Sequence, residues 1–85
     1  MNISLHKDFE KQFVKLTPNQ QKKFKERRNI FLQEQFHPIL NNHALQGKYL
    51  GFRSINITGD LRAIFKKEGD DVMFVAIDSH SNLYG

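Results

Sequence analysis

The sequence predicts an α+β fold in the order β-α-α-β-β-β, with a helical hairpin packed on one face of an antiparallel sheet. Three β-like runs fill the last third of the chain, at residues 49–58, 61–67 and 72–77. Two apolar patterns of helical period precede them, and a short alternating run opens the chain. Because the chain has 85 residues and no cysteine, we expect a single domain, residues 1–85, stabilised by packing alone or by a partner.

The N-terminal part is predicted to form a strand and a first helix. Ile3 and Leu5 alternate with polar residues over positions 2–6, which is typical of a strand. Asp8 is placed to cap the helix that follows. The apolar side of that helix consists of Phe9, Phe13 and Leu16.

The second helix carries a clear start signal. Thr17 is the expected N-cap, Pro18 fits the first turn, and Gln20 completes a capping box. The helix is expected to run to about Gln35, because Pro38 prevents its continuation. We expect the two helices to pair as a hairpin that covers one face of the sheet.

The rest of the chain is predicted as a connector followed by three antiparallel strands. Residues 43–49 form the connector, and Gly51 permits a turn or a bulge after it. Tight turns at 58–60 and 68–71 join the strands. Both faces of the strands mix apolar and polar residues, so a bulge at a glycine would change the facing of a strand arginine. The pattern therefore leaves the facing of Arg53 open.

Positive charge is concentrated in the predicted helices. The net charge is +4, and residues 1–28 carry eight Lys or Arg against three Asp or Glu. Such a patch suits RNA, DNA or an acidic protein segment, and a solvated helix face is the alternative. We expect an RNA backbone to be bound by Lys22, Lys23 and Arg27. No apolar run is long enough for a signal peptide or a membrane span, so we expect a cytoplasmic protein.

The C-terminal tail combines candidate catalytic groups with arginines on the strands. His80 follows the last strand, and an imidazole exchanges protons near neutral pH. Tyr84 offers a ring that can stack on a base. Arg62 and Arg53 are suited to clamp a phosphate in bidentate fashion. The structural alternatives are a surface histidine, a docked terminal aromatic and cross-strand ion pairs.

Two further polar residues flank the strands. Asp60 either stabilises its turn or acts as a base, and His43 is either a loop residue or a catalytic group. The four histidines lack the paired spacing of metal ligands, and the chain has no thiol. We therefore expect neither a metal site nor a cofactor.

Two segments of the chain resemble the RelE/ParE superfamily of type II toxin–antitoxin toxins, and within it the YafQ-type mRNA interferases. The first begins at His43 and reads HALQGKYLGFRSINITGDLRAIFK, and the second, at 79–84, reads SHSNLY. The resemblance extends over nearly the whole chain. It implies a ribosome-dependent endoribonuclease that cuts mRNA without a metal ion and is silenced by a cognate antitoxin protein.

The resemblance also implies roles for individual residues. The residues implied as catalytic are His80, Asp60, His43 and Arg62. The residues implied as RNA or phosphate contacts are Arg53, Tyr84 and Asn56.

Three positions depart from the YafQ pattern. Asn56 stands in place of a second histidine and cannot shuttle a proton. Leu61 replaces a tryptophan beside the aspartate. Ala76 replaces an arginine that would contact phosphate, and Arg62 can substitute for that arginine electrostatically.

In the implied mechanism, the ribose 2′-hydroxyl of the substrate is the nucleophile. Asp60 or His43 removes its proton, and Arg62 stabilises the charge on the phosphate with help from Arg53. His80 protonates the 5′-oxygen leaving group, so the products carry a 2′,3′-cyclic phosphate and a 5′-hydroxyl.

Two other classes of function remain open from the sequence. One is a ParE-like toxin that acts on DNA gyrase, and the other is a toxin-fold binding module with a decayed site. The expected partners are a cognate antitoxin, the ribosome and mRNA. An acidic amphipathic antitoxin segment suits an apolar helical hairpin with a basic surface.

Overall fold

The protein forms a five-stranded sheet with two longer segments of helix, as described by a computed structural model for residues 1–84. The strands are β1 (Asn2–Leu5), β2 (His43–Ala44), β3 (Arg53–Asn56), β4 (Leu61–Glu68) and β5 (Asp71–Ser79). The α-helices are α1 (Lys7–Phe13), α2 (Pro18–Gln33) and α3 (His80–Tyr84), and the 3-10 helices are η1 (Pro38–Leu40) and η2 (Gly47–Tyr49). The strand order is β1-β5-β4-β3-β2. The predicted α+β fold is confirmed.

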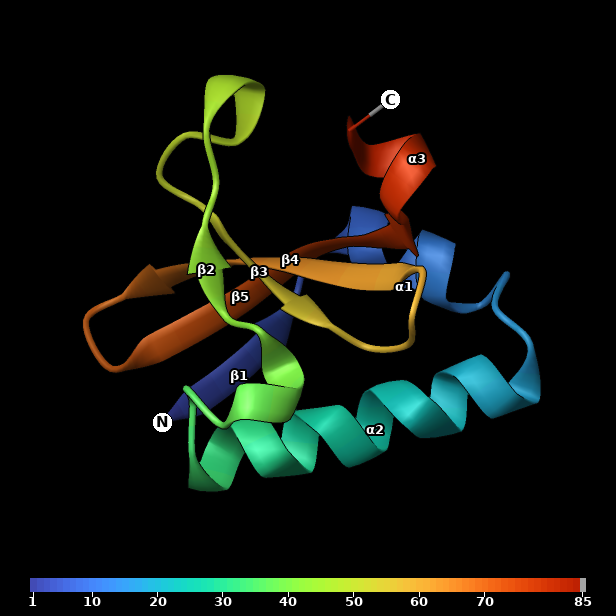
Figure 1. Ribbon diagram of the computed structural model, residues 1–85, viewed down its shortest axis with the longest axis horizontal. Coiled ribbons are helices and arrows are strands. Elements are labelled where there is room, and N and C mark those ends of the chain that lie inside the picture. Colours follow the sequence, from blue (N-terminus) through green and yellow to red (C-terminus); the bar gives the residue numbers. More distant parts are fainter. Residues whose placement is uncertain (85) are drawn as a thin grey trace.

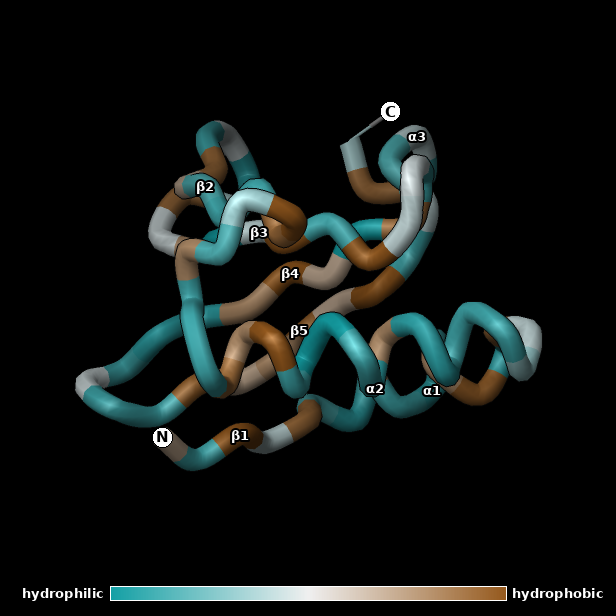
Figure 2. Tube along the Cα trace, turned by 60° about the horizontal axis from the view of Figure 1, so that its bottom comes forward, coloured by the Kyte–Doolittle hydropathy of each residue, from teal (hydrophilic) through white to brown (hydrophobic). Residues whose placement is uncertain are grey.

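The helical hairpin covers one face of this sheet (Figure 1). Phe9 of α1 and two phenylalanines of α2, Phe24 and Phe31, pack there against Phe65 and Phe74 of the central strands. These five side chains are at most 2% exposed. The main core therefore lies between the hairpin and the sheet, whereas long stretches of α2 are hydrophilic (Figure 2).

The opposite face carries a smaller apolar cluster. Its buried members are Leu45, Ile64, Ala76 and Leu83. Neighbouring residues on a strand point to opposite faces, so Ile64 lies here while Phe65 lies under the helices. Figure 1 shows α3 on this side of the sheet, opposite α2. We call this face the tail face, because the C-terminal residues dock on it.

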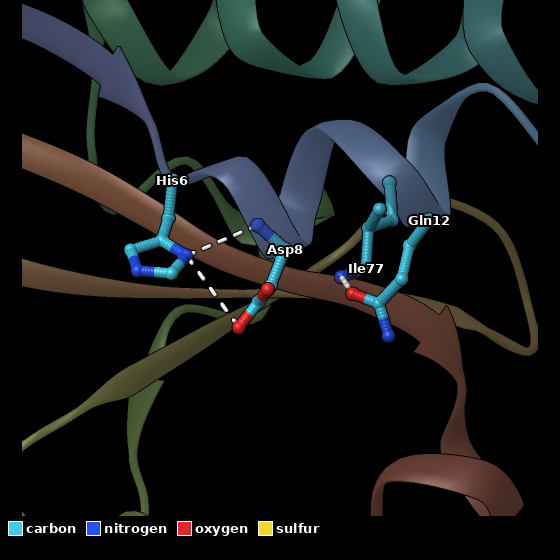
Figure 3. Close-up of polar contacts among 4 residues, drawn as sticks. All are labelled: His6, Asp8, Gln12 and Ile77. Carbon is cyan, nitrogen blue, oxygen red and sulfur yellow. Dashed lines mark hydrogen bonds and ion pairs between the residues drawn. The ribbon is translucent and has the colours of Figure 1, made fainter.

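The sequence predicted the N-cap of α2 correctly but not that of α1. Thr17 and Gln20 form the predicted capping box at α2. The expectation that Asp8 caps α1 is wrong, because the chain is still extended at His6 and the helix begins one residue earlier than Asp8. The imidazole Nδ1 of His6 accepts the backbone N–H of Asp8 at 3.1 Å, as Figure 3 shows.

A β-bulge in β5 sets which residues face the helices. Ile64 pairs with Ala76 and Phe65 pairs with Phe74, so Val75 has no partner in β4. The side chain of Gln12 in α1 reaches this strand, and its Oε1 accepts the backbone N–H of Ile77 at 3.0 Å (Figure 3). The bulge places Ile77 in the helix-side core and Ala76 on the tail face. The sequence had indicated only that a glycine such as Gly51 permits a bulge, whereas the observed bulge lies in β5.

Two strand pairings were not predicted. Residues 43–49, expected as a connector, contain β2, which pairs with β3 antiparallel, and η2. The edge strand β1 runs parallel to β5, whereas the other pairs are antiparallel. Within residues 1–84 no helix is long and apolar enough to cross a membrane.

Candidate active site

The start of α3 is joined to the turn between β3 and β4. The backbone N–H of His80 donates to the carbonyl oxygen of Asp60 at 2.9 Å. The imidazole of His80 packs edge-on against the ring of Tyr84, with 4.8 Å between centroids. Leu83 is only 4% exposed, so the tail is anchored by burial as well as by hydrogen bonding. Three of the predicted site residues therefore lie at one corner of the sheet.

Arg62 reaches the same turn from β4. Its Nη1 donates to the carbonyl oxygens of Thr58 and Gly59, both at 3.0 Å. Asp78 lies directly opposite Arg62 on β5, but no ion pair joins the two among the described residues. The guanidinium is thus fixed beside the turn by one nitrogen, and Nε and Nη2 are the nitrogens that can bind an incoming phosphate.

His43 lies on the edge strand β2, and its side chain is exposed. Its Nδ1 is 2.8 Å from the carbonyl oxygen of Asn41. A carbonyl oxygen only accepts, so Nδ1 carries the proton and donates it. In the neutral ring Nε2 then has the free lone pair, which is the arrangement that a general base requires.

Two polar groups of β3 lie on the tail face between these sites. Ser54 pairs with His43 on one side and Ile64 on the other, and Asn56 lies opposite Arg62. The Ser54 Oγ and the Asn56 Oδ1 are buried without a hydrogen-bond partner in the described part of the chain. Sequence analysis named Asn56 but missed Ser54, because a small residue in a strand gives no sign of an unpaired hydroxyl.

Arg53 does not join this group. It lies opposite Phe65, so its side chain belongs to the helix side of the sheet. Its Nε donates to the Oδ1 of Asn42 at 2.8 Å, and the guanidinium lies 5.4 Å from the ring centroid of Phe36. The expected phosphate contact of Arg53 is therefore not supported by its position.

The three basic residues of α2 also lie away from the tail. They are on the helix covering the opposite face of the sheet (Figure 1). Lys22 is exposed, Lys23 pairs with Glu26 at 3.4 Å, and Arg27 donates to the carbonyl oxygen of Ile39 at 3.3 Å. These side chains can bind a polyanion only on the helix side.

An aromatic extension of the site was missed by sequence analysis. The ring of Tyr49 in η2 lies 6.2 Å from that of Tyr84, nearly perpendicular to it. The Nζ of Lys48 lies 5.3 Å from the centroid of the Tyr49 ring. The sequence signal that could have indicated Tyr49 is its aromatic ring two positions before Gly51, in the segment predicted as a connector. The site as a whole is exposed, because His43, Asp60 and His80 all lie at the surface.

The sheet, with a helical hairpin on one face and a histidine-bearing tail on the other, is a fold that the chain shares with solved toxin structures. The chain is similar to YafQ from E. coli strain BL21(DE3), with 21% identity, a TM-score of 0.81 and coverage of 99% of this chain and 98% of that one. It is also similar to a copper-bound mutant toxin from Helicobacter pylori, with 28% identity, a TM-score of 0.80 and 99% coverage of both chains.

The chain belongs to the YafQ family of bacterial toxins from type II toxin–antitoxin systems, because the model of that family matches residues 1–85. It is therefore a toxin component, and its family implies an endoribonuclease kind of activity rather than the ParE-like alternative. The E. coli DinJ–YafQ complex contains a similar chain, with 22% identity, a TM-score of 0.78 and coverage of 99% of this chain and 98% of that one. A comparison with curated protein sequences gives no match.

Proposed function

We propose that this toxin, acting as a single domain in the cytoplasm, cleaves mRNA on the ribosome without a metal ion. The observation that carries the proposal is the docking of the tail on the sheet. It holds the imidazole of His80 against Tyr84, ties the His80 backbone to Asp60, and leaves both beside the turn that anchors Arg62.

The positions of the two histidines support a division of roles. His43 lies on β2 and His80 follows β5, three strands away, and strands are spaced about 4.8 Å apart, so the two histidines start on opposite sides of the site, on the order of 14 Å apart across the sheet. An in-line displacement at phosphorus needs a base on one side and an acid on the other. In this proposal the Nε2 of His43 removes the proton of the 2′-hydroxyl, and His80 protonates the 5′-oxygen.

The remaining residues stabilise and orient the substrate. Arg62 binds the phosphate and stabilises its extra negative charge in the transition state. Asp60 orients His80 through its backbone carbonyl oxygen, which accepts the N–H of His80, and Asn56 binds the RNA without transferring a proton. Tyr84 stacks on a base. Because the nucleophile belongs to the substrate, the products carry a 2′,3′-cyclic phosphate and a 5′-hydroxyl.

The exposure of His43, Asp60 and His80 supports dependence on the ribosome. An exposed site neither orders a flexible RNA nor excludes water by itself, and both effects contribute to rate. A translating ribosome would present the mRNA in a fixed, bent conformation. The exposed part of α2, including Lys22, would bind the ribosomal RNA backbone. A cognate antitoxin is the second partner, by analogy with the E. coli DinJ–YafQ toxin–antitoxin complex.

The test compares the wild-type toxin with His80→Ala on translating ribosomes, with mRNA 5′ ends mapped by primer extension. We expect the cleavage rate to fall by about 10²–10⁴-fold, which is the usual contribution of a general acid. His6→Asn is the matched control, because it removes a histidine far from the tail and keeps a residue that can cap α1.

Three results would contradict the proposal. Equal cleavage by His80→Ala would remove the role of the tail imidazole. Inhibition of gyrase supercoiling with intact mRNA would favour the ParE-like activity. A folded wild-type protein that is harmless when induced without an antitoxin would indicate a decayed site.

The chemistry has a test of its own. Cleavage should continue in EDTA, because no metal ion takes part, and mass spectrometry should find cyclic phosphate ends.

A further inference from the structure

We propose that Arg53 is a positioning residue for His43, acting through Asn42, and not a ligand of the substrate phosphate. This inference rests on the proposed function, in which His43 is the general base. It goes beyond that function because it assigns a task to an arginine on the face of the sheet away from the reaction.

Arg53 is held by several contacts on the helix side. Its Nε donates to the Oδ1 of Asn42 at 2.8 Å, and its Nη2 lies 3.4 Å from the carbonyl oxygen of the same residue. The guanidinium also lies over the ring of Phe36. Two contacts to one asparagine use the planar, fork-like geometry of a guanidinium, which a lysine ammonium lacks.

Asn42 is fixed from its other side as well. Its Nδ2 donates to the carbonyl oxygen of Gln35 at 3.1 Å, so the residue bridges the segment after α2 to β3. The preceding residue, Asn41, has φ 46° and ψ 49°, a left-handed conformation that non-glycine residues rarely adopt. Its carbonyl oxygen is the one that accepts from the Nδ1 of His43. The hydrogen bonds of Arg53 therefore fix Asn42, which directly precedes the candidate base, His43.

The short strand β2 makes this support necessary. It has two residues, it lies at the edge of the sheet, and its ladder to β3 consists of two residue pairs. Arg53 pairs with Ala44, whereas His43 pairs with Ser54. Because neighbouring residues point to opposite faces, the guanidinium lies on one face and the imidazole on the other. Arg53 therefore acts on His43 through the backbone and not by direct contact.

The experiment uses Arg53→Met, which removes the donors and the charge, and Arg53→Lys, which keeps the charge. Ring ¹⁵N shifts of His43 are measured by NMR above the titration range of imidazole, where the tautomer is visible. We expect wild type to have the proton on Nδ1 and both variants to show a mixture of tautomers. Lys66→Met is the control, because it removes a cation of the same sheet that pairs with Glu68.

Cleavage kinetics on ribosomes provide the second measurement. Both variants should lower kcat by about ten- to a hundredfold, which is the effect of a base displaced by about 1 Å. KM and its dependence on salt should stay as in wild type. Loss of a phosphate contact would instead reduce the slope of log affinity against log salt by about one.

The outcomes separate the inference from the proposed function. A His43 tautomer that stays unchanged in Arg53→Lys and in any folded Arg53→Met overturns the inference, and so does a reduced salt slope. If wild type cleaves no RNA, the proposed function fails, while the NMR measurement still decides whether Arg53 positions His43. Should Arg53→Met fail to fold, the Arg53→Lys variant decides.

Discussion

Ser54 is fully buried in β3, and its hydroxyl has no hydrogen-bond partner within residues 1–84. Its neighbours across the strands are His43 and Ile64, so the hydroxyl lies under the tail face close to the candidate base. Burying a hydroxyl without a partner costs about 1–3 kcal/mol. A smaller apolar residue would avoid this cost, which means that the strand carries a serine at the expense of stability.

The first prediction concerns this residue. Ser54→Ala should raise the free energy of unfolding by about 1 kcal/mol, because it removes an unpaired buried hydroxyl and changes the volume little. Urea unfolding followed by circular dichroism measures the change. Ser4→Ala, an exposed serine of β1, should leave the value unaltered. A loss of stability in Ser54→Ala would show that the hydroxyl has a bonding partner.

For single residues, the sequence was better at indicating which side chains are candidates for the site than at indicating where those side chains lie. Histidine, tyrosine and arginine near a strand end were sufficient to name His80, Tyr84 and Arg62 as candidates. The facing of Arg53 was not predictable, since both faces of its strand carry apolar residues. It follows only from the pairing of Arg53 with Phe65, a contact between separate strands.

Among the elements, α1 and β5 are linked by a single polar contact. The Oε1 of Gln12 accepts the backbone N–H of Ile77, which comes two residues after the unpaired Val75 of the bulge (Figure 3). The side chain of Ile77 is 1% exposed, so its N–H has little access to water as a replacement. This contact holds the part of β5 that leads directly to the tail.

The second prediction tests that contact. Gln12→Met keeps a similar shape but removes the acceptor, so it should lower the free energy of unfolding by about 1–3 kcal/mol. Amide hydrogen exchange at Ile77 should become faster, which NMR measures directly. Gln12→Glu keeps an acceptor and should retain slow exchange. Equally slow exchange in all three proteins would mean that the strand is held without this side chain.

Elements defined by local signals were predictable, and those defined by distant partners were not. The capping box of α2 depends on Thr17 and Gln20, which are three residues apart. The strand β2 exists only because β3 pairs with it, and the parallel direction of β1 depends on β5. Neither pairing changes the apolar period of its own segment, so periodicity could not indicate it.

At the scale of the whole molecule, the sheet separates two faces, the helix face and the tail face. The tail face carries the candidate active site, with His43, Asp60, Arg62 and His80. The helix face carries α2, which is largely hydrophilic (Figure 2) and is rich in Lys and Arg. α2 and the tail that carries His80 lie on opposite sides of the sheet, with the sheet and the main core between them (Figure 1). In the proposed function, the helix face attracts the polyanion and the tail face carries out catalysis.

The third prediction follows from this separation. The double variant Lys22→Gln, Lys23→Gln should raise KM for ribosomes and reduce the slope of log affinity against log salt by about one to two, since each phosphate contact contributes about 0.7–0.9. Its kcat at saturating ribosomes should match wild type, because the reacting groups are untouched. Lys66→Gln, on β4, should change neither value. A fall in kcat with an unaltered salt slope would place α2 in the chemistry and contradict the division between the two faces.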